Sequence, residues 1–104
     1  MLKALGNEQD FKKHVDQGVT VVDFYADWCG PCQALGPTLE ELVKKHDGKV
    51  NVLKINVDEN PSLAQEHGVR GIPALFFYKE GEIKSTLTGN HPLGELDKQV
   101  SQLF

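Results

Sequence analysis

Two cysteines, Cys29 and Cys32, are the residues whose type and spacing most directly suggest chemistry in this sequence. They are the only cysteines among 104 residues, and they stand three positions apart. A thiolate is a nucleophile, and a pair at this spacing can close into a disulfide or exchange one with another molecule. The pair therefore predicts thiol–disulfide exchange, with a metal site and two inert core thiols as the alternatives.

A metal site is the weaker reading of this pair. Structural zinc takes four ligands, usually two cysteine pairs or one pair with two histidines. The sequence has no second cysteine pair. Its four histidines are scattered and lack the usual ligand spacing: His14, His46, His67 and His91. We therefore expect no metal, and the intervening Gly30-Pro31 argues against two inert core thiols.

The flanking segments place the cysteines between a strand and a helix. Residues 19–25 are short, β-branched and mostly apolar, which suits a strand buried on both faces. After Cys32, leucines recur at helical spacing and the segment ends in basic residues. Cys29 thus falls at a helix N-terminus, where unpaired N–H groups favour the thiolate. We expect Cys29 to be the exposed attacking thiol and Cys32, on the same helical face, to be the shielded resolving thiol.

The rest of the chain continues the alternation of strands and helices. A first helix is expected after the potential cap Asn7, ending at Gly18. Glu80-Gly81 is typical of a hairpin turn. The other expected elements are a short strand at 2–5, a strand at 50–57, a helix from Asn60-Pro61 to His67-Gly68, strands at 74–78 and 82–88, and a helix at 93–103. This order predicts an α/β fold with a central mixed sheet of four to five strands flanked by four helices.

Length and charge narrow the class of protein further. The length fits one domain, residues 1–104. The net charge of −4 offers no clustered basic face for nucleic acid and no polybasic patch for membranes. Residues 1–6 are too short for the apolar core of a secretion signal, and no apolar run is long enough to span a membrane. We therefore expect a reducing compartment, the cytoplasm, with a monomer as the default.

The segment Trp28-Cys29-Gly30-Pro31-Cys32 resembles the active-site motif of the thioredoxin family. The resemblance covers nearly the whole chain in order: Val22-Asp23-Phe24-Tyr25-Ala26, Pro37, Lys54, Asp58, Gly71-Ile72-Pro73, Gly81 and Gly89. It implies the thioredoxin fold and a protein-disulfide reductase with no bound cofactor, whose redox centre is the Cys29–Cys32 disulfide. The Gly-Pro dipeptide is similar to the reductant branch of the family, since oxidant and isomerase relatives usually carry His there.

Two charged residues interrupt otherwise apolar strands. Asp23 is costly to bury unless it is paired or protonated, so its alternative is a surface position on an edge strand. The flanking apolar residues favour a central strand, and the resemblance implies that Asp23 accepts the proton of Cys32. Lys54 is expected either beside Asp23, where it would tune its pKa, or as a solvated strand lysine.

The family resemblance also implies a docking surface near the cysteines. It implies a cis bond before Pro73, although most X–Pro bonds are trans. The Ile72 backbone would then be free to pair with an extended substrate chain. The expected apolar docking patch consists of Trp28, Gly30, Pro31, Ile72, Pro73 and Gly89.

The resemblance implies a thioredoxin reductase as electron donor, flavin-dependent or ferredoxin-linked, and disulfide-containing proteins as targets. The sequence departs from the family at Gln33, where relatives often have Lys or Arg, at Tyr25, where Trp is common, and in the loop around Gly89. Two rival functions remain open at this point. One is a disulfide oxidant or isomerase, and the other is a binding subunit of a larger complex that uses the docking patch without redox chemistry.

Overall fold

The computed structural model describes residues 2–4 and 11–104, which form a layered α/β structure. Asn7, the expected cap of the first helix, lies outside the described residues. The strands are β1 (Leu2–Ala4), β2 (Val19–Tyr25), β3 (Val50–Asn56), β4 (Ala74–Lys79) and β5 (Glu82–Thr88). The helices are α1 (Phe11–Val15), α2 (Gly30–Lys45), α3 (Pro61–Glu66) and α4 (Leu93–Ser101).

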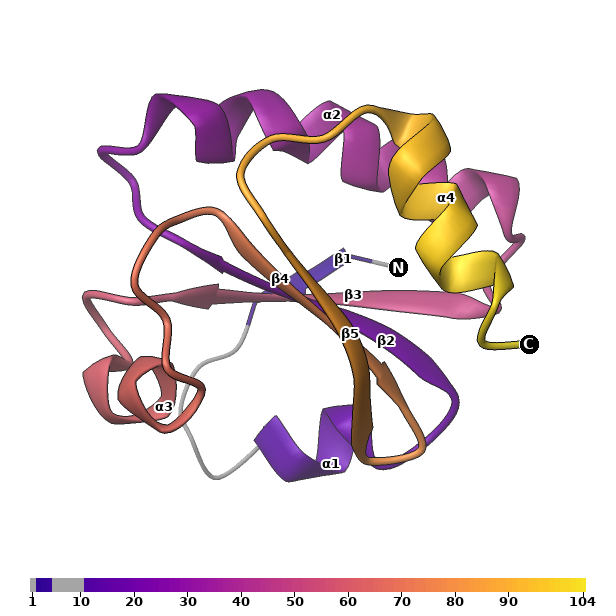
Figure 1. The fold of residues 1–104 in the computed structure, drawn as a ribbon, viewed down its shortest axis with the longest axis horizontal. Helices are drawn as coiled ribbons and strands as arrows, with labels where there is room; N and C mark the ends of the chain where they lie inside the picture. The colour runs from indigo at the N-terminus through magenta and orange to yellow at the C-terminus, as the bar shows by residue number, and fades with distance from the viewer. Residues whose placement is uncertain (1, 5–10) are drawn as a thin grey trace.

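Strand β2 lies in the middle of the sheet, whose strand order is β1-β3-β2-β4-β5 (Figure 1). It runs parallel to β3 and antiparallel to β4, and β5 returns antiparallel to β4. The sheet is therefore mixed, as predicted. Because β2 has a neighbour on each side and helices above and below, its side chains are buried on both faces, including the polar Thr20 and Asp23.

Alternate side chains of β2 enter two cores on opposite faces of the sheet. Helices α2 and α4 cover one face, and α1 and α3 cover the other (Figure 1). Val19 and Val21 belong to the core under α2 and α4. Val22 and Phe24 belong to the core on the side of α1 and α3. By this alternation Asp23 projects toward the face that α2 covers.

The predicted boundaries of strands β2 to β5 agree with the structure to within one residue. The bounds of β2 and β5 are those predicted, whereas β3 ends one residue earlier and β4 one residue later. Glu80 and Gly81 have φ angles of 49° and 87°, so both adopt the left-handed conformation of a tight two-residue hairpin. The expected hairpin turn is confirmed.

The connection from β2 to α2 sets the position of the cysteines. The chain leaves the carboxyl end of β2 and reaches the start of α2 through residues 26–29. Open α/β sheets bind their ligands beyond the carboxyl ends of the strands. The fold therefore brings Cys29 and Cys32 to the edge where a site is expected.

Candidate functional site

Cys29 and Cys32 are joined by a disulfide at the first turn of α2. Their Cα atoms lie 5.3 Å apart. Cys29 is the N-cap of the helix, and its sulfur accepts a hydrogen bond from the Cys32 backbone N–H at 3.2 Å. Pro31 occupies the first turn, where its missing N–H removes no helical hydrogen bond. When the disulfide opens, this N–H and the helix N-terminus favour a thiolate on Cys29.

The two cysteines are almost equally buried, with exposed fractions of 5% for Cys29 and 4% for Cys32. The expected contrast between an exposed and a shielded thiol is therefore absent in this disulfide form. The bonded sulfurs share one small cluster with Ala26, Tyr25, Val57 and Ile72, which covers both of them. Exposure does not distinguish the two thiols, so hydrogen bonding and neighbouring groups must do so.

The loop before β4 reaches the Cys29 sulfur. The Ile72–Pro73 peptide bond is cis, as the family resemblance implied. The Cys29 sulfur lies 3.8 Å from the Ile72 carbonyl oxygen. Among the described residues, the Ile72 N–H has no hydrogen-bond partner. Pro73 is buried, and its carbonyl accepts a hydrogen bond from the Gly89 N–H at 2.8 Å.

Asp23 is fully buried in the central strand. This confirms the central position and excludes the edge-strand alternative. Asp23 aligns with Lys54 of β3 and with Leu75 of β4. Neither carboxylate oxygen has a hydrogen-bond partner among the described residues. Burial raises the pKa of Asp23 to about 7, and the charge of Lys54 opposes this rise. The carboxyl group can therefore gain or lose a proton near neutral pH.

Lys54 lies beside Asp23 in the strand register but does not form an ion pair with it in the described part of the chain. Its side chain is half-buried, so it is not a freely solvated strand lysine. The ammonium nitrogen lies 4.5 Å from the centre of the Tyr25 ring. Burial of that ring raises the pKa of Tyr25, and the charge of Asp27 adds to the rise.

The predicted docking residues divide between an open hollow and its surroundings. Trp28, with an exposed fraction of 73%, lines the hollow together with Val57, Val69, Arg70, Gly71 and Ile72. The other predicted residues do not line it: Gly30, Pro31, Pro73 and Gly89. Gly30 and Pro31 are exposed at the start of α2. Gly89 donates its backbone N–H to the Pro73 carbonyl oxygen.

Asp58 and Asn56 are site residues to which the sequence analysis gave no role. The Trp28 indole N–H donates to the Asp58 carboxylate at 2.9 Å, across thirty positions of sequence. The Asn56 side-chain oxygen accepts from the backbone N–H groups of Asp58, at 2.8 Å, and Glu59, at 3.3 Å. The cluster Asn56 to Asn60 at the end of a strand is a turn signal, but nothing in the local sequence pairs it with Trp28.

Gln33, which stands where relatives often have a cation, makes a local contact. Its side-chain amide donates to the Asp27 carbonyl at 2.8 Å. The amide thus secures the turn before the cysteines and adds no positive charge there.

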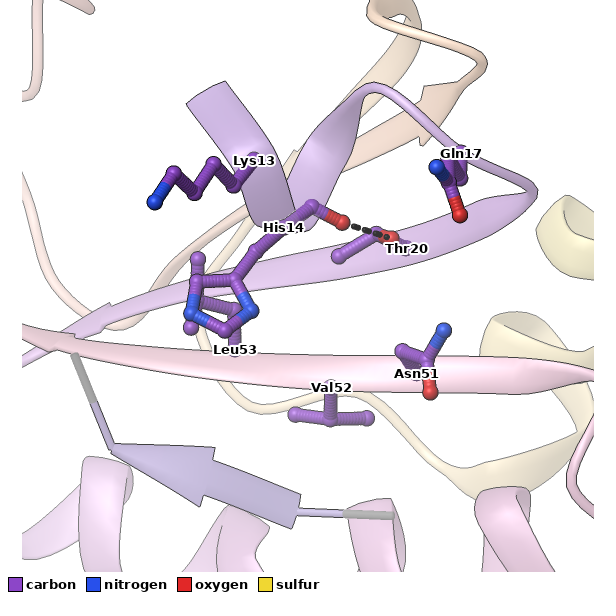
Figure 2. A pocket seen from close by; sticks show the side chains of 7 residues that line it. All are labelled: Lys13, His14, Gln17, Thr20, Asn51, Val52 and Leu53. Carbon is purple, nitrogen blue, oxygen red and sulfur yellow. Dashed lines mark hydrogen bonds between the residues drawn. The ribbon is translucent and has the colours of Figure 1, made fainter. Parts of the chain in front are cut away.

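A separate hollow lies between α1 and β3, lined by Lys13, His14, Gln17, Thr20, Asn51, Val52 and Leu53 (Figure 2). Thr20 donates its hydroxyl to the His14 carbonyl oxygen at 3.2 Å. None of the predicted site residues lines this hollow.

Two properties of residues 2–4 and 11–104 bear on cofactors and membranes. These residues contain no group of three or more histidine, cysteine, aspartate or glutamate side chains that could hold a metal ion. No helix formed by them is long and apolar enough to cross a membrane.

Comparisons with known proteins agree with the geometry. The family model described as Thioredoxin matches residues 3–102. The chain is 46% identical over 85 residues to a thioredoxin of Staphylococcus epidermidis, covering 82% of each chain. It is 42% identical over 95 residues to one of Staphylococcus saprophyticus subsp. saprophyticus, covering 91% of each. A mutant thioredoxin from Halobacterium salinarum NRC-1 superposes with a TM-score of 0.90 at 36% identity, over 98% of this chain and 89% of that one.

Proposed function

This chain belongs to the thioredoxin family, and we propose that Cys29 attacks the disulfides of target proteins while Cys32 resolves the resulting intermediate. The protein is a thiol–disulfide oxidoreductase that works through its own cysteine pair, Cys29 and Cys32, as a protein-disulfide reductase. The observation that carries the proposed order of attack is the N-cap position of Cys29, whose sulfur accepts the Cys32 N–H.

The exchange proceeds in two displacement steps. The Cys29 thiolate attacks one sulfur of a target disulfide, the target S–S bond breaks, and the leaving sulfur departs as a thiolate that takes a proton. The Cys32 thiol then gives up its proton, and its sulfur attacks Cys29 in the mixed disulfide. The second target sulfur leaves, and the Cys29–Cys32 disulfide remains. Two electrons have moved from the cysteine pair to the target.

Asp23 is the proposed acceptor of the Cys32 proton. It projects from β2 toward the face that α2 covers, and α2 carries Cys32 in its first turn. Because burial raises its pKa to about 7, the carboxylate is basic enough to take a proton near neutral pH and can release it afterwards. Lys54, the neighbour of Asp23 in the strand register, is the proposed charge that limits this rise.

The loop at Ile72 and the exposed indole of Trp28 are the proposed docking surface for the target. The Ile72 N–H has no hydrogen-bond partner among the described residues, so it and the Ile72 carbonyl oxygen can pair with an extended target chain that passes beside Cys29. Trp28, which lines the same hollow as Ile72, provides apolar contact area. Gly30, Pro31, Pro73 and Gly89 complete the proposed patch around the cysteines.

Residues 1–104 are proposed to act as a single domain, as a monomer, in the cytoplasm. The electron donor is proposed to be a thioredoxin reductase, because the chain belongs to the thioredoxin family. The proposed partners are proteins with accessible disulfides. We propose no binding to nucleic acid or to a membrane.

A reduction assay with a matched set of variants tests this function. The wild type, Cys29→Ser and the double variant Cys29→Ser/Cys32→Ser are supplied with a dithiol and a generic protein disulfide. Wild type should reduce the target much faster than the dithiol alone, and both variants should not. A rate no better than that of the dithiol would contradict the reductase function. A cellular role that persists in the double variant would instead support the binding subunit.

The direction of electron flow is tested by equilibrating the cysteine pair with glutathione. If the protein is a reductase, most of its cysteine pair should be oxidised at equilibrium even in a reduced glutathione buffer, because a strongly reducing dithiol passes its electrons to glutathione disulfide. A pair that stays reduced in an oxidising buffer would favour the disulfide oxidant.

A further inference from the structure

Two groups on one face of the sheet can attract the Lys54 ammonium, the Asp23 carboxyl group and the Tyr25 ring. The ammonium lies over the Tyr25 ring. Asp23 is its neighbour in the register of β2 and β3. Tyr25 follows Asp23 by two positions in the same strand and projects from the same face. The Lys54 ammonium lies 4.5 Å from the centre of the Tyr25 ring. No ion pair joins Lys54 to Asp23 within the described residues.

The ring competes with the carboxylate for the cation. A buried carboxylate with no hydrogen-bond partner attracts an ammonium group strongly, because screening is weak away from water. The face of a tyrosine ring also attracts a cation through its quadrupole. Since the side chain of Lys54 begins beside Asp23 and ends over Tyr25, the ring determines how close the charge comes to the carboxylate.

We propose that Tyr25 is a positioning residue that holds the Lys54 ammonium over its ring and away from contact with Asp23, so that Asp23 can bind and release a proton during exchange. The proposal rests on the proposed role of Asp23 as proton acceptor. An opposite charge within about 4–6 Å lowers the pKa of a carboxyl group by about 1–3 pH units. A directly paired Lys54 would therefore leave Asp23 ionised across the neutral range and weaken it as a base.

In the part of the chain that the structure describes, the groups packed around Asp23 leave Lys54 as the charge that acts on it. The aligned residue of β4 is Leu75, which is apolar. The α2 residue of the redox pair, Cys32, does not titrate while the disulfide is intact. Among the described residues, Lys54 is the charge that acts on the pKa of Asp23, whereas Asp27, Glu59 and Asp23 itself act on the pKa of Tyr25. The oxidised protein is therefore the form in which the effect of Lys54 can be isolated.

The test is an NMR titration of the Asp23 carboxyl carbon in oxidised protein. Tyr25→Phe keeps the ring and should titrate like wild type. Tyr25→Leu removes the ring and should lower the pKa of Asp23 by about one pH unit, because Lys54 can then approach it. In a Lys54→Met background, Tyr25→Leu should cause no such decrease.

Two results would overturn the proposal. One is an unchanged or raised Asp23 pKa in Tyr25→Leu. The other is a decrease that persists with Lys54→Met, since water entering in place of the ring would then be the cause.

A second measurement uses only the wild-type protein and does not depend on the folding of any variant. In wild type, the ε-methylene protons of Lys54 should be shifted upfield by the Tyr25 ring current, and unshifted protons would overturn the proposal. Both measurements follow the groups directly. A failure of the reductase assay would therefore refute the proposed function without changing either result.

Discussion

Replacing Asp23 by asparagine tests the energetic cost of keeping an ionisable carboxyl group in the core. The pKa of Asp23 rises from 3.8 to about 7 because burial disfavours the charged form. The folded state thus binds this proton more tightly than the unfolded chain, so stability is lost as pH rises from about 4 through 7. At about 1.4 kcal/mol per pH unit, the wild type should lose about 2–3 kcal/mol through this group between pH 5 and pH 8.

The assay is guanidinium chloride unfolding of the oxidised proteins across this pH range. Asp23→Asn does not titrate, and any fixed cost of burying its amide cancels when two pH values are compared. The variant should therefore gain about 2–3 kcal/mol over wild type between pH 5 and pH 8. Glu40→Gln, at an exposed position of α2, should follow wild type. Parallel curves for wild type and Asp23→Asn would refute the reasoning.

Three further outcomes are expected. In the reduced protein near neutral pH, an alkylating agent should label Cys29 before Cys32, because the Cys32 N–H and the helix N-terminus stabilise the Cys29 thiolate. Equal labelling rates by peptide mapping would contradict this order. Asp58→Ala removes the acceptor of the Trp28 indole N–H. Because the lost hydrogen bond contributes about 1 kcal/mol, KM for a protein disulfide should rise about fivefold with kcat little changed, whereas the control Glu59→Ala should resemble wild type. The purified protein should contain no stoichiometric zinc, because only two thiols converge, and one zinc per chain by elemental analysis would overturn the redox assignment.

The elements that carry a local chemical signal were predictable from the sequence. The β-branched run of β2 favours a strand and Gly81 favours a tight turn, and the positions of both elements match the structure. The place of Cys29 at the start of α2 followed from the switch between strand and helix periodicity. The cis bond before Pro73 had no such local signal and depended on the family resemblance.

The contacts that tune the site were not predictable because they join segments far apart in the chain. Nothing local to Trp28 indicates that its indole meets Asp58. Likewise, the sequence left Lys54 either beside Asp23 or solvated, and nothing in it indicates that the Lys54 ammonium lies over Tyr25. The similar burial of Cys29 and Cys32 also depends on packing around the bonded pair and not on their positions in the helix.

Covalent trapping of a target protein tests the central claim, that Cys29 attacks and Cys32 resolves. Cys32→Ser keeps the attacking thiol, but a serine hydroxyl cannot resolve the mixed disulfide. Incubated with a disulfide-containing protein, Cys32→Ser should accumulate a covalent complex on non-reducing gels that a reducing agent releases. Cys29→Ser should trap far less, because its remaining thiol lacks the N-cap position. Equal capture by the two variants would contradict the assigned order of attack.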